Sequence, residues 1–186
     1  MVPLKRLTAM ARDNNIIPID PFRNFVAEKE SIDRGYLTTS ELEALISVKL
    51  PDIMWEIVRD MFVFCCFTGL SHADLLKLTK DNLQDFFDGN EWIICRRRKT
   101  KTRSNIPLLE IPKKIIAKYS EYGVNNHVFP VPSNSKCNTL IKVVGGYAQI
   151  DKHLTFHMSR HTFATLMLTK GCLLYTSPSP RDKRQS

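Results

Sequence analysis

Three features that define other protein classes are missing from this sequence. No apolar run approaches the roughly 18 residues that a membrane-spanning helix needs. Residues 1–11 are basic and hold no long apolar stretch, so no signal peptide is expected. The five cysteines, an odd number, include no C-x-x-C pair. The sequence therefore predicts no membrane interaction through a bilayer-spanning helix, no disulfide framework and no structural zinc site, but a cytoplasmic protein with reduced, buried thiols.

The composition is that of a folded, basic chain. The 186 residues are 43% hydrophobic, which is enough for one domain with a real core. Lys and Arg outnumber Asp and Glu, and the formal net charge is +8 at pH 7. This excess favours a polyanionic partner, either nucleic acid or an acidic membrane surface, although many basic proteins bind neither.

Hydrophobic periodicity predicts a mainly α-helical chain with a small antiparallel β-hairpin or sheet, an α+β layout. Helices are expected after the capping box Thr38-x-x-Glu41, over 52–67, after the capping box Ser71-x-x-Asp74, from Pro112, over 133–144 and over 156–170. Gly69 is expected to end the second helix, and Gly145-Gly146 to weaken the fifth. Residues 92–95 and 106–109 predict the hairpin, and Pro107 assigns its strand to a sheet edge.

The turn of this hairpin concentrates positive charge. Six of its eight residues are basic, namely Arg96, Arg97, Arg98, Lys99, Lys101 and Arg103. Like charges repel one another, and a phosphate backbone would relieve that repulsion and release counterions. We therefore predict DNA contacts from this turn, with a merely solvated surface turn as the alternative.

A second basic feature lies on the last predicted helix. His157 and Arg160 are separated by three positions, so they project from one face of a helix. An arginine fork and a neighbouring histidine can hold one phosphate, with the histidine as donor or proton shuttle. An H-x-x-R pair alone is weak, because a solvated helix face accounts for it equally well.

A metal site is the competing interpretation of the same helix. His153, His157 and His161 are spaced by four, which could align three ligands. No carboxylate stands where the H-E-x-x-H arrangement has one, and Leu154-Thr155 reads as a loop or strand before the helix starts. A metal-dependent hydrolase is therefore the less favoured alternative, and the sequence predicts neither a metal nor another cofactor.

Taken together, three segments resemble in order and spacing the catalytic domain of tyrosine recombinases, the phage integrase family. They are residues 67–75 (FTGLSHADL), the hairpin residues 97–100 (RRKT) with 106–108 (IPL), and residues 154–165 (LTFHMSRHTFAT). The resemblance extends from about Gly35 to Gly171. Within the family, the sequence resembles the integrases of mobile elements in Bacteroides-type bacteria. It implies three parts: 1–30 as the end of a core-binding helical domain with its linker, 31–171 as a truncated catalytic domain, and 172–186 as an unrelated or disordered tail.

The resemblance also implies a reaction. In this family a tyrosine attacks a DNA phosphate, two arginines bind the non-bridging oxygens, and a hairpin lysine protonates the leaving oxygen. By that likeness Lys99, eight residues before Pro107, is the lysine, His157 and Arg160 are the H-x-x-R pair, and Asp74 braces the site. Double-stranded DNA at attachment sites is the implied partner, with self-assembly on that DNA in the full-length protein.

The sequence departs from the family pattern at two places. Ser71 occupies the position of the first arginine, so Arg59 or one of Arg96, Arg97 and Arg98 would have to supply that charge. Beyond Gly171 the pattern is lost, and Tyr175 is too close to Arg160 to be the nucleophile, so none is expected in this chain. The implied function is a site-specific recombinase or integrase, here a fragment lacking the nucleophile. The alternatives are a DNA-binding fragment without turnover and a basic helical protein with an unrelated partner.

Overall fold

The computed structural model describes residues 2–22, 24, 35–85, 89–97, 102–121 and 126–169. The chain divides into two compact units, Met1–Asp33 and Arg34–Ser186. Within the described ranges, no helix combines the length and the apolar character that crossing a membrane requires.

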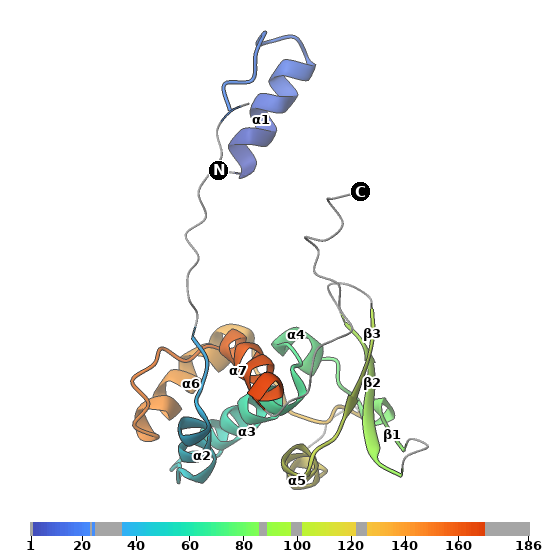
Figure 1. Cartoon of the computed structure of the whole chain (residues 1–186), viewed down its shortest axis with the longest axis vertical. Helices are drawn as coiled ribbons and strands as arrows, with labels where there is room; N and C mark the ends of the chain where they lie inside the picture. The colour runs from blue at the N-terminus through green and yellow to red at the C-terminus, as the bar shows by residue number, and fades with distance from the viewer. Residues whose placement is uncertain are drawn as a thin grey trace. The chain divides into compact units, whose positions relative to one another are not determined.

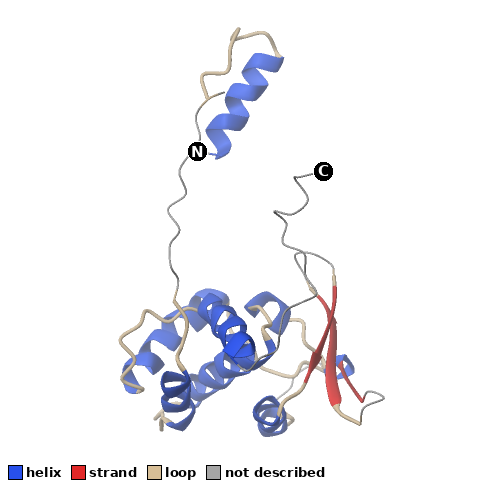
Figure 2. Ribbon diagram, viewed as in Figure 1, coloured by secondary structure: helices blue, strands red, loops and turns tan. Residues whose placement is uncertain are grey.

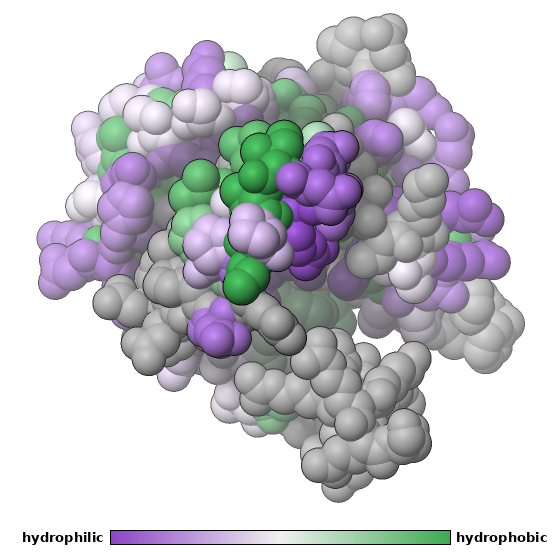
Figure 3. All heavy atoms as spheres, turned by 90° about the horizontal axis from the view of Figure 1, so that it is seen from above, coloured by the Kyte–Doolittle hydropathy of each residue, from purple (hydrophilic) through white to green (hydrophobic). Residues whose placement is uncertain are grey.

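Among its described residues, the first unit contains one helix, α1 (Val2–Asp13), followed by a turn. Its apolar side chains Leu4, Leu7 and Met10 are half or more exposed. The polar residues Lys5 and Arg6 lie between Leu4 and Leu7 in the sequence of this helix. Figure 3 shows green apolar side chains beside purple polar ones on the face of the molecule that it displays. The helix is thus amphipathic, as expected of an element that packs its apolar side on something else.

The second unit combines helices with a small sheet, so the predicted fold class is confirmed (Figures 1 and 2). In chain order its elements are α2 (Thr39–Ser47), α3 (Ile53–Thr68), α4 (His72–Leu75), the 3₁₀ helix η1 (Lys80–Asn82), β1 (Leu83–Asp85), β2 (Glu91–Arg96), β3 (Arg103–Pro107), α5 (Glu110–Tyr119), α6 (Asn134–Tyr147) and α7 (Phe156–Thr169). The predicted capping box at the start of α2 is confirmed, with the Thr38 N–H donating to Glu41 Oε2 over 2.7 Å.

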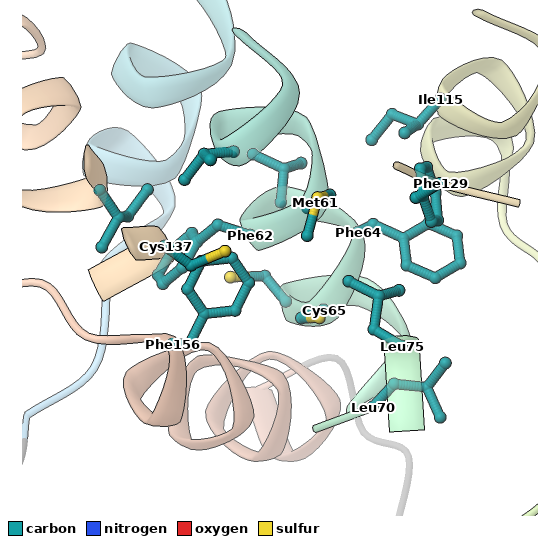
Figure 4. Close-up of a cluster of buried hydrophobic side chains, with 14 of the residues drawn as sticks. Met61, Phe62, Phe64, Cys65, Leu70, Leu75, Ile115, Phe129, Cys137 and Phe156 are labelled. Atoms are coloured by element: carbon teal, nitrogen blue, oxygen red, sulfur yellow. The ribbon is translucent and has the colours of Figure 1, made fainter. Parts of the chain in front are cut away.

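Helix α3 is the centre of the core and contacts α2, α5, α6 and α7. Asp52 begins it by accepting hydrogen bonds from the Met54 and Trp55 amides. Its side chains point to both sides in Figure 4: Phe62 packs edge-on against Phe156 of α7, with ring centroids 5.6 Å apart, and Phe64 packs against Phe129. These contacts fix α7, which carries the H-x-x-R pair, on the core.

The sheet is antiparallel in the order β1-β2-β3. Strands β2 and β3 form the predicted hairpin with Arg96 opposite Arg103 and Cys95 opposite Ser104. Pro107 lies on an edge strand, as predicted, where its missing N–H leaves no ladder bond unmade. Strand β1 was not predicted, because three residues are too few to show an alternating pattern.

The prediction that α6 weakens at its glycine pair was wrong, because the helix continues through both residues to Tyr147. A Cβ at Gly145 would lie 2.9 Å from Leu154 Cδ1, so glycine here permits close packing. Helix α5 begins at Glu110, two residues before the predicted start at Pro112. Pro112 is compatible with this start, because amides in the first turn have no helical acceptor.

Four cysteines lie in the described residues, and all four are free thiols, as expected. Cys65 and Cys66 of α3 are fully buried in the core. Burial raises the pKa of the Cys65 thiol to about 12. At neutral pH these cysteines therefore act as small apolar side chains and not as nucleophiles.

Candidate phosphate-binding site

The first turns of α7 separate a buried face from an exposed one. The Phe156 amide donates to Asn138 Oδ1 over 2.8 Å and ties the start of α7 to α6. On the buried face, Thr162 Oγ1 accepts a hydrogen bond from the Leu37 amide. On the other face, His157 is exposed and Arg160 half-buried. Packing of one face therefore presents the H-x-x-R pair at the surface.

Arg160 is positioned by the backbone at the end of α3. Its Nη1 donates to the Gly69 carbonyl oxygen over 3.0 Å. Gly69 ends α3 in the left-handed region with φ of 66°, as the sequence predicted. A Cβ at this position would lie only 2.6 Å from the Phe163 ring of α7. Glycine thus serves twice here, since it permits both the turn and the close approach that brings this carbonyl to Arg160.

The Ser71 side chain caps the start of α4. Its hydroxyl accepts a hydrogen bond from the Asp74 amide over 3.2 Å and donates to Asp74 Oδ2 over 2.7 Å. The carboxylate of Asp74 thereby holds Ser71 beside the site. Ser71 brings a neutral hydroxyl where the resemblance implies a cation, so any compensating charge must come from another element.

His72 is a buried histidine beside the site that sequence reasoning did not single out. Its Nε2 lies 3.0 Å from the Pro132 carbonyl oxygen, and its ring packs edge-on against Phe156. Because a carbonyl can only accept, Nε2 carries the donated proton. Burial lowers the pKa of His72, so its imidazole is neutral near pH 7. Nothing in the sequence pattern indicates that His72 is buried, because its burial depends on packing between α4, α7 and the 130–133 loop.

Two hollows meet at the H-x-x-R pair. The larger, of about 590 Å³, is lined by Ser71, His72, Ala73, Leu76, Ser133, Asn134, Asn138, Thr155, Phe156, His157 and Arg160. The smaller, of about 330 Å³, is lined by Gly69, Arg97, His157, Arg160, His161, Phe163 and Ala164. His157 and Arg160 line both. The structure therefore brings together residues from α3, the hairpin and α7, three segments far apart in the sequence (Figure 1).

The hairpin contributes Arg97 to this site. Its amide donates to the Thr102 carbonyl over 3.0 Å, and its Nε donates to Ser104 Oγ over 3.1 Å. Arg96 and Arg103, a cross-strand pair, are exposed. The predicted lysine, Lys99, lies outside the described residues, as do the predicted DNA contacts Arg98 and Lys101.

Two opposite charges influence Cys95, the β2 residue two positions before Arg97. Burial raises the pKa of the Cys95 thiol first, and the negative charge of Asp74 raises it further. The positive charge of Arg97 acts in the opposite direction. The Asp74 carboxylate and the Arg97 guanidinium therefore both lie close enough to Cys95 to influence it, one from α4 and one from the hairpin.

The histidine triplet of the hydrolase alternative does not form a ligand cluster. His157 and His161 lie on α7 with their ring centroids 5.0 Å apart, whereas His153 belongs to the loop before that helix. Among the residues that the structure describes, no three His, Cys, Asp or Glu side chains gather as a metal site would require. The geometry thus favours an anion site over a metal centre.

Comparison with known proteins identifies the family. The model of the phage integrase family matches residues 36–174. Tyrosine recombinase XerC of Rickettsia canadensis (strain McKiel) is 31% identical over 149 residues, which covers 71% of this chain and 47% of that protein. The chain thus spans about half the length of the curated relative that it matches.

Solved structures show the same fold at low sequence identity. A λ integrase dimer bound to a core site has a TM-score of 0.71 at 17% identity, covering 90% of this chain and 62% of that one. The Tn1549 transposon integrase in complex with circular intermediate DNA has a TM-score of 0.65 at 19% identity, covering 92% and 65%. With the family match extending over most of its length, this chain belongs to the phage integrase family of tyrosine recombinases.

Proposed function

We propose that this chain carries most of the catalytic domain of a site-specific DNA recombinase or integrase. The reaction would break and rejoin DNA strands through a phosphotyrosyl intermediate, without metal or cofactor. The observation that carries the proposal is the convergence of Arg97, His157 and Arg160 on one hollow beside Gly69. Two guanidinium groups and an imidazole at one surface hollow favour an oxyanion such as a DNA phosphate.

The geometry supports specific roles for these residues. The Gly69 carbonyl engages one of the five N–H groups of Arg160, while a bidentate contact to phosphate needs two. A guanidinium held in this way is preorganised to stabilise the charge that develops on the phosphate oxygens. His157 would donate a further hydrogen bond, and Lys99 would protonate the leaving oxygen. We propose that Asp74 braces the site through its bond to Ser71.

Double-stranded DNA at attachment sites is the proposed partner. Two structures with the same fold are a λ integrase dimer bound to a core site and a λ integrase tetramer bound to a Holliday junction. By analogy we propose that the longer protein assembles on DNA, as part of a mobile element of Bacteroides-type bacteria. A DNA substrate is also the reason for proposing a cytoplasmic location. We further propose that this chain lacks the nucleophile.

DNA binding tests the proposal directly. Fluorescence anisotropy with a labelled duplex is measured over a series of salt concentrations for the wild type and Arg160→Ala. We expect the wild-type affinity to fall steeply with salt, because binding releases counterions from several phosphates. We expect Arg160→Ala to weaken binding by ~10-fold or more, since it removes a charge-assisted contact.

Lys49→Ala is the matched control, because it removes one positive charge from an exposed position in the loop between α2 and α3. Its affinity is expected to stay within about threefold of the wild type, as for a remote charge screened by salt. Binding that is insensitive to salt, or equal losses in the two variants, would contradict the proposal. Loss of binding on addition of a chelator would instead support the metal-dependent hydrolase.

A further inference from the structure

We propose that Arg97 supplies the guanidinium charge that Ser71 lacks, by contacting the same phosphate as Arg160. This inference rests on the proposed function and adds a catalytic residue to it. The need arises because the Ser71 hydroxyl is neutral and is already engaged with Asp74 on both its donor and its acceptor side. A single guanidinium would leave part of the developing phosphate charge unbalanced.

Arg97 meets the geometric requirement because it lines the same hollow as Arg160 and His157. The hollow also includes Gly69, whose carbonyl binds Arg160, so the two guanidinium groups border one space of about 330 Å³. They reach it from separate elements, one from the hairpin and one from α7. Two guanidinium groups would bind an anion between them from two sides. This favours in-line placement of a phosphate over its loose association with the hollow.

The backbone and side chain of Arg97 are both fixed. Its amide continues the β2–β3 pairing by donating to Thr102, and its Nε donates to Ser104 Oγ. The Nε bond uses one of the five guanidinium N–H groups, as the Gly69 bond does for Arg160. Ser104 therefore acts as a positioning residue for Arg97, in the way that Gly69 acts for Arg160.

Arg59, one of the residues that could replace the missing arginine, is engaged elsewhere. Its side chain is only 11% exposed, its Nε donates to Asp60, and its Nη1 donates to the Val48 carbonyl over 2.7 Å. Moving it to the phosphate would leave the buried Asp60 carboxylate without one of its partners, which is costly because a buried charge would lose its compensation. Arg59 thus serves the core and not the site.

The neighbouring arginine on the hairpin, Arg96, faces the other way. Successive side chains of a strand point to opposite faces of the sheet. Arg97 faces the hollow beside α7, whereas Arg96 is exposed opposite Arg103. The third arginine of the run, Arg98, lies outside the described residues. Arg97 is thus the arginine of this set that the structure brings to Arg160.

Two like charges at one hollow also give a reason for anion binding. In the absence of an anion, the guanidinium groups of Arg97 and Arg160 repel each other across this hollow. A phosphate between them converts that repulsion into two attractions. Affinity should then depend on both arginines jointly, more than on total positive charge.

Nuclear magnetic resonance of the 186-residue chain, titrated with inorganic phosphate, tests this inference. We expect the side-chain Nε–H signals of Arg97 and Arg160 to shift along saturable curves with one common midpoint. In Arg97→Ala, the midpoint reported by Arg160 should rise by ~10-fold, because a charge-assisted contact is lost. Arg97→Lys keeps the charge without the fork and should give an intermediate value.

Lys49→Ala measures the general effect of removing one positive charge, and we expect less than about a threefold rise in the midpoint. The decisive variant combines Arg97→Ala with Ser71→Arg, which returns a guanidinium to the α4 side of the site. Recovery of the phosphate midpoint in this double variant is expected if Arg97 performs that task. Thermal unfolding of each variant verifies that it remains folded.

The outcomes separate this inference from the function on which it rests. If Arg160 of the wild type does not respond to phosphate and the chain does not bind DNA, the proposed function and the inference both fail. If Arg160 responds and DNA binds, but Arg97→Ala behaves like Lys49→Ala, only the role of Arg97 is overturned. Equal rises in the midpoint for Arg97→Ala and Lys49→Ala, with no rise for Arg97→Lys, would likewise show that bulk charge and not a shared site sets the affinity.

Discussion

At the scale of single residues, the Asp60 carboxylate illustrates how a buried charge is kept in the core. It accepts hydrogen bonds from Arg59 Nε, Lys118 Nζ and the Tyr119 hydroxyl, each over 2.8 Å. With 6% exposure it is shielded from water, and its partners compensate for lost hydration. Burial raises the pKa of Tyr119, and the bond to Asp60 raises it further, so the phenol remains a donor.

Asp60→Ala is expected to lower the free energy of unfolding by about 3–5 kcal/mol, because it leaves buried Arg59 unpaired. Glu56→Ala is the matched control, since Glu56 binds the same Lys118 over 3.1 Å at a more exposed place. There we expect a loss below about 1 kcal/mol. Denaturant unfolding with circular dichroism measures both values, and equal losses would show that the buried network is not a stabilising unit.

At the scale of elements, the two glycines of α6 make a matched pair. Gly146 is exposed, and a Cβ there would meet no atom within 4 Å. Gly146→Ala should therefore stabilise the chain by about 0.5–1 kcal/mol, through helix propensity. Gly145→Ala gains the same propensity but places its Cβ 2.9 Å from Leu154 Cδ1 in the buried core.

We therefore expect Gly145→Ala to be destabilising by about 1–3 kcal/mol, the cost of overpacking a core. Differential scanning calorimetry of the two variants is the measurement. Stabilisation by both substitutions would mean that the Leu154 side chain can move away without an energetic penalty. Close packing would then not be the reason for a glycine at position 145.

The same elements show which features a sequence can reveal. The Thr38 capping box, the Gly69 turn and the hairpin were predicted because each depends on neighbours in the chain. The continuity of α6 was missed because it depends on Leu154, a tertiary neighbour. The site residues likewise fall into those that the sequence predicts and those that it does not. The i and i+3 spacing predicts that His157 and Arg160 share a helix face, and the density of positive charge predicts that the hairpin contacts DNA. Which hairpin arginine reaches them, and the burial of His72, depend on packing that periodicity does not encode.

At the scale of the whole molecule, the proposed strand cleavage requires a tyrosine to reach the phosphate that we propose Arg160 binds. Attack requires the reacting atoms to approach to about 3–3.5 Å. Helix α7 carries the chain away from Arg160 for nine residues to Thr169, about 13.5 Å at 1.5 Å per residue. Tyr175 follows six residues later, and six residues span at most about 20 Å. Its hydroxyl could thus return to the site only if the chain reversed direction soon after Thr169 and ran back toward Arg160.

We therefore expect no covalent protein–DNA adduct when this chain is incubated with labelled, nicked duplexes of randomised sequence and resolved on a denaturing gel. Saturable DNA binding in the same samples would make the chain a binding fragment of a recombinase. The informative comparison is the wild type with Tyr175→Phe, because that substitution removes only the hydroxyl. An adduct present in the wild type and absent in Tyr175→Phe would identify Tyr175 as the nucleophile. An adduct that persists in both would place the nucleophile at another residue of the chain, and either result would overturn the expectation.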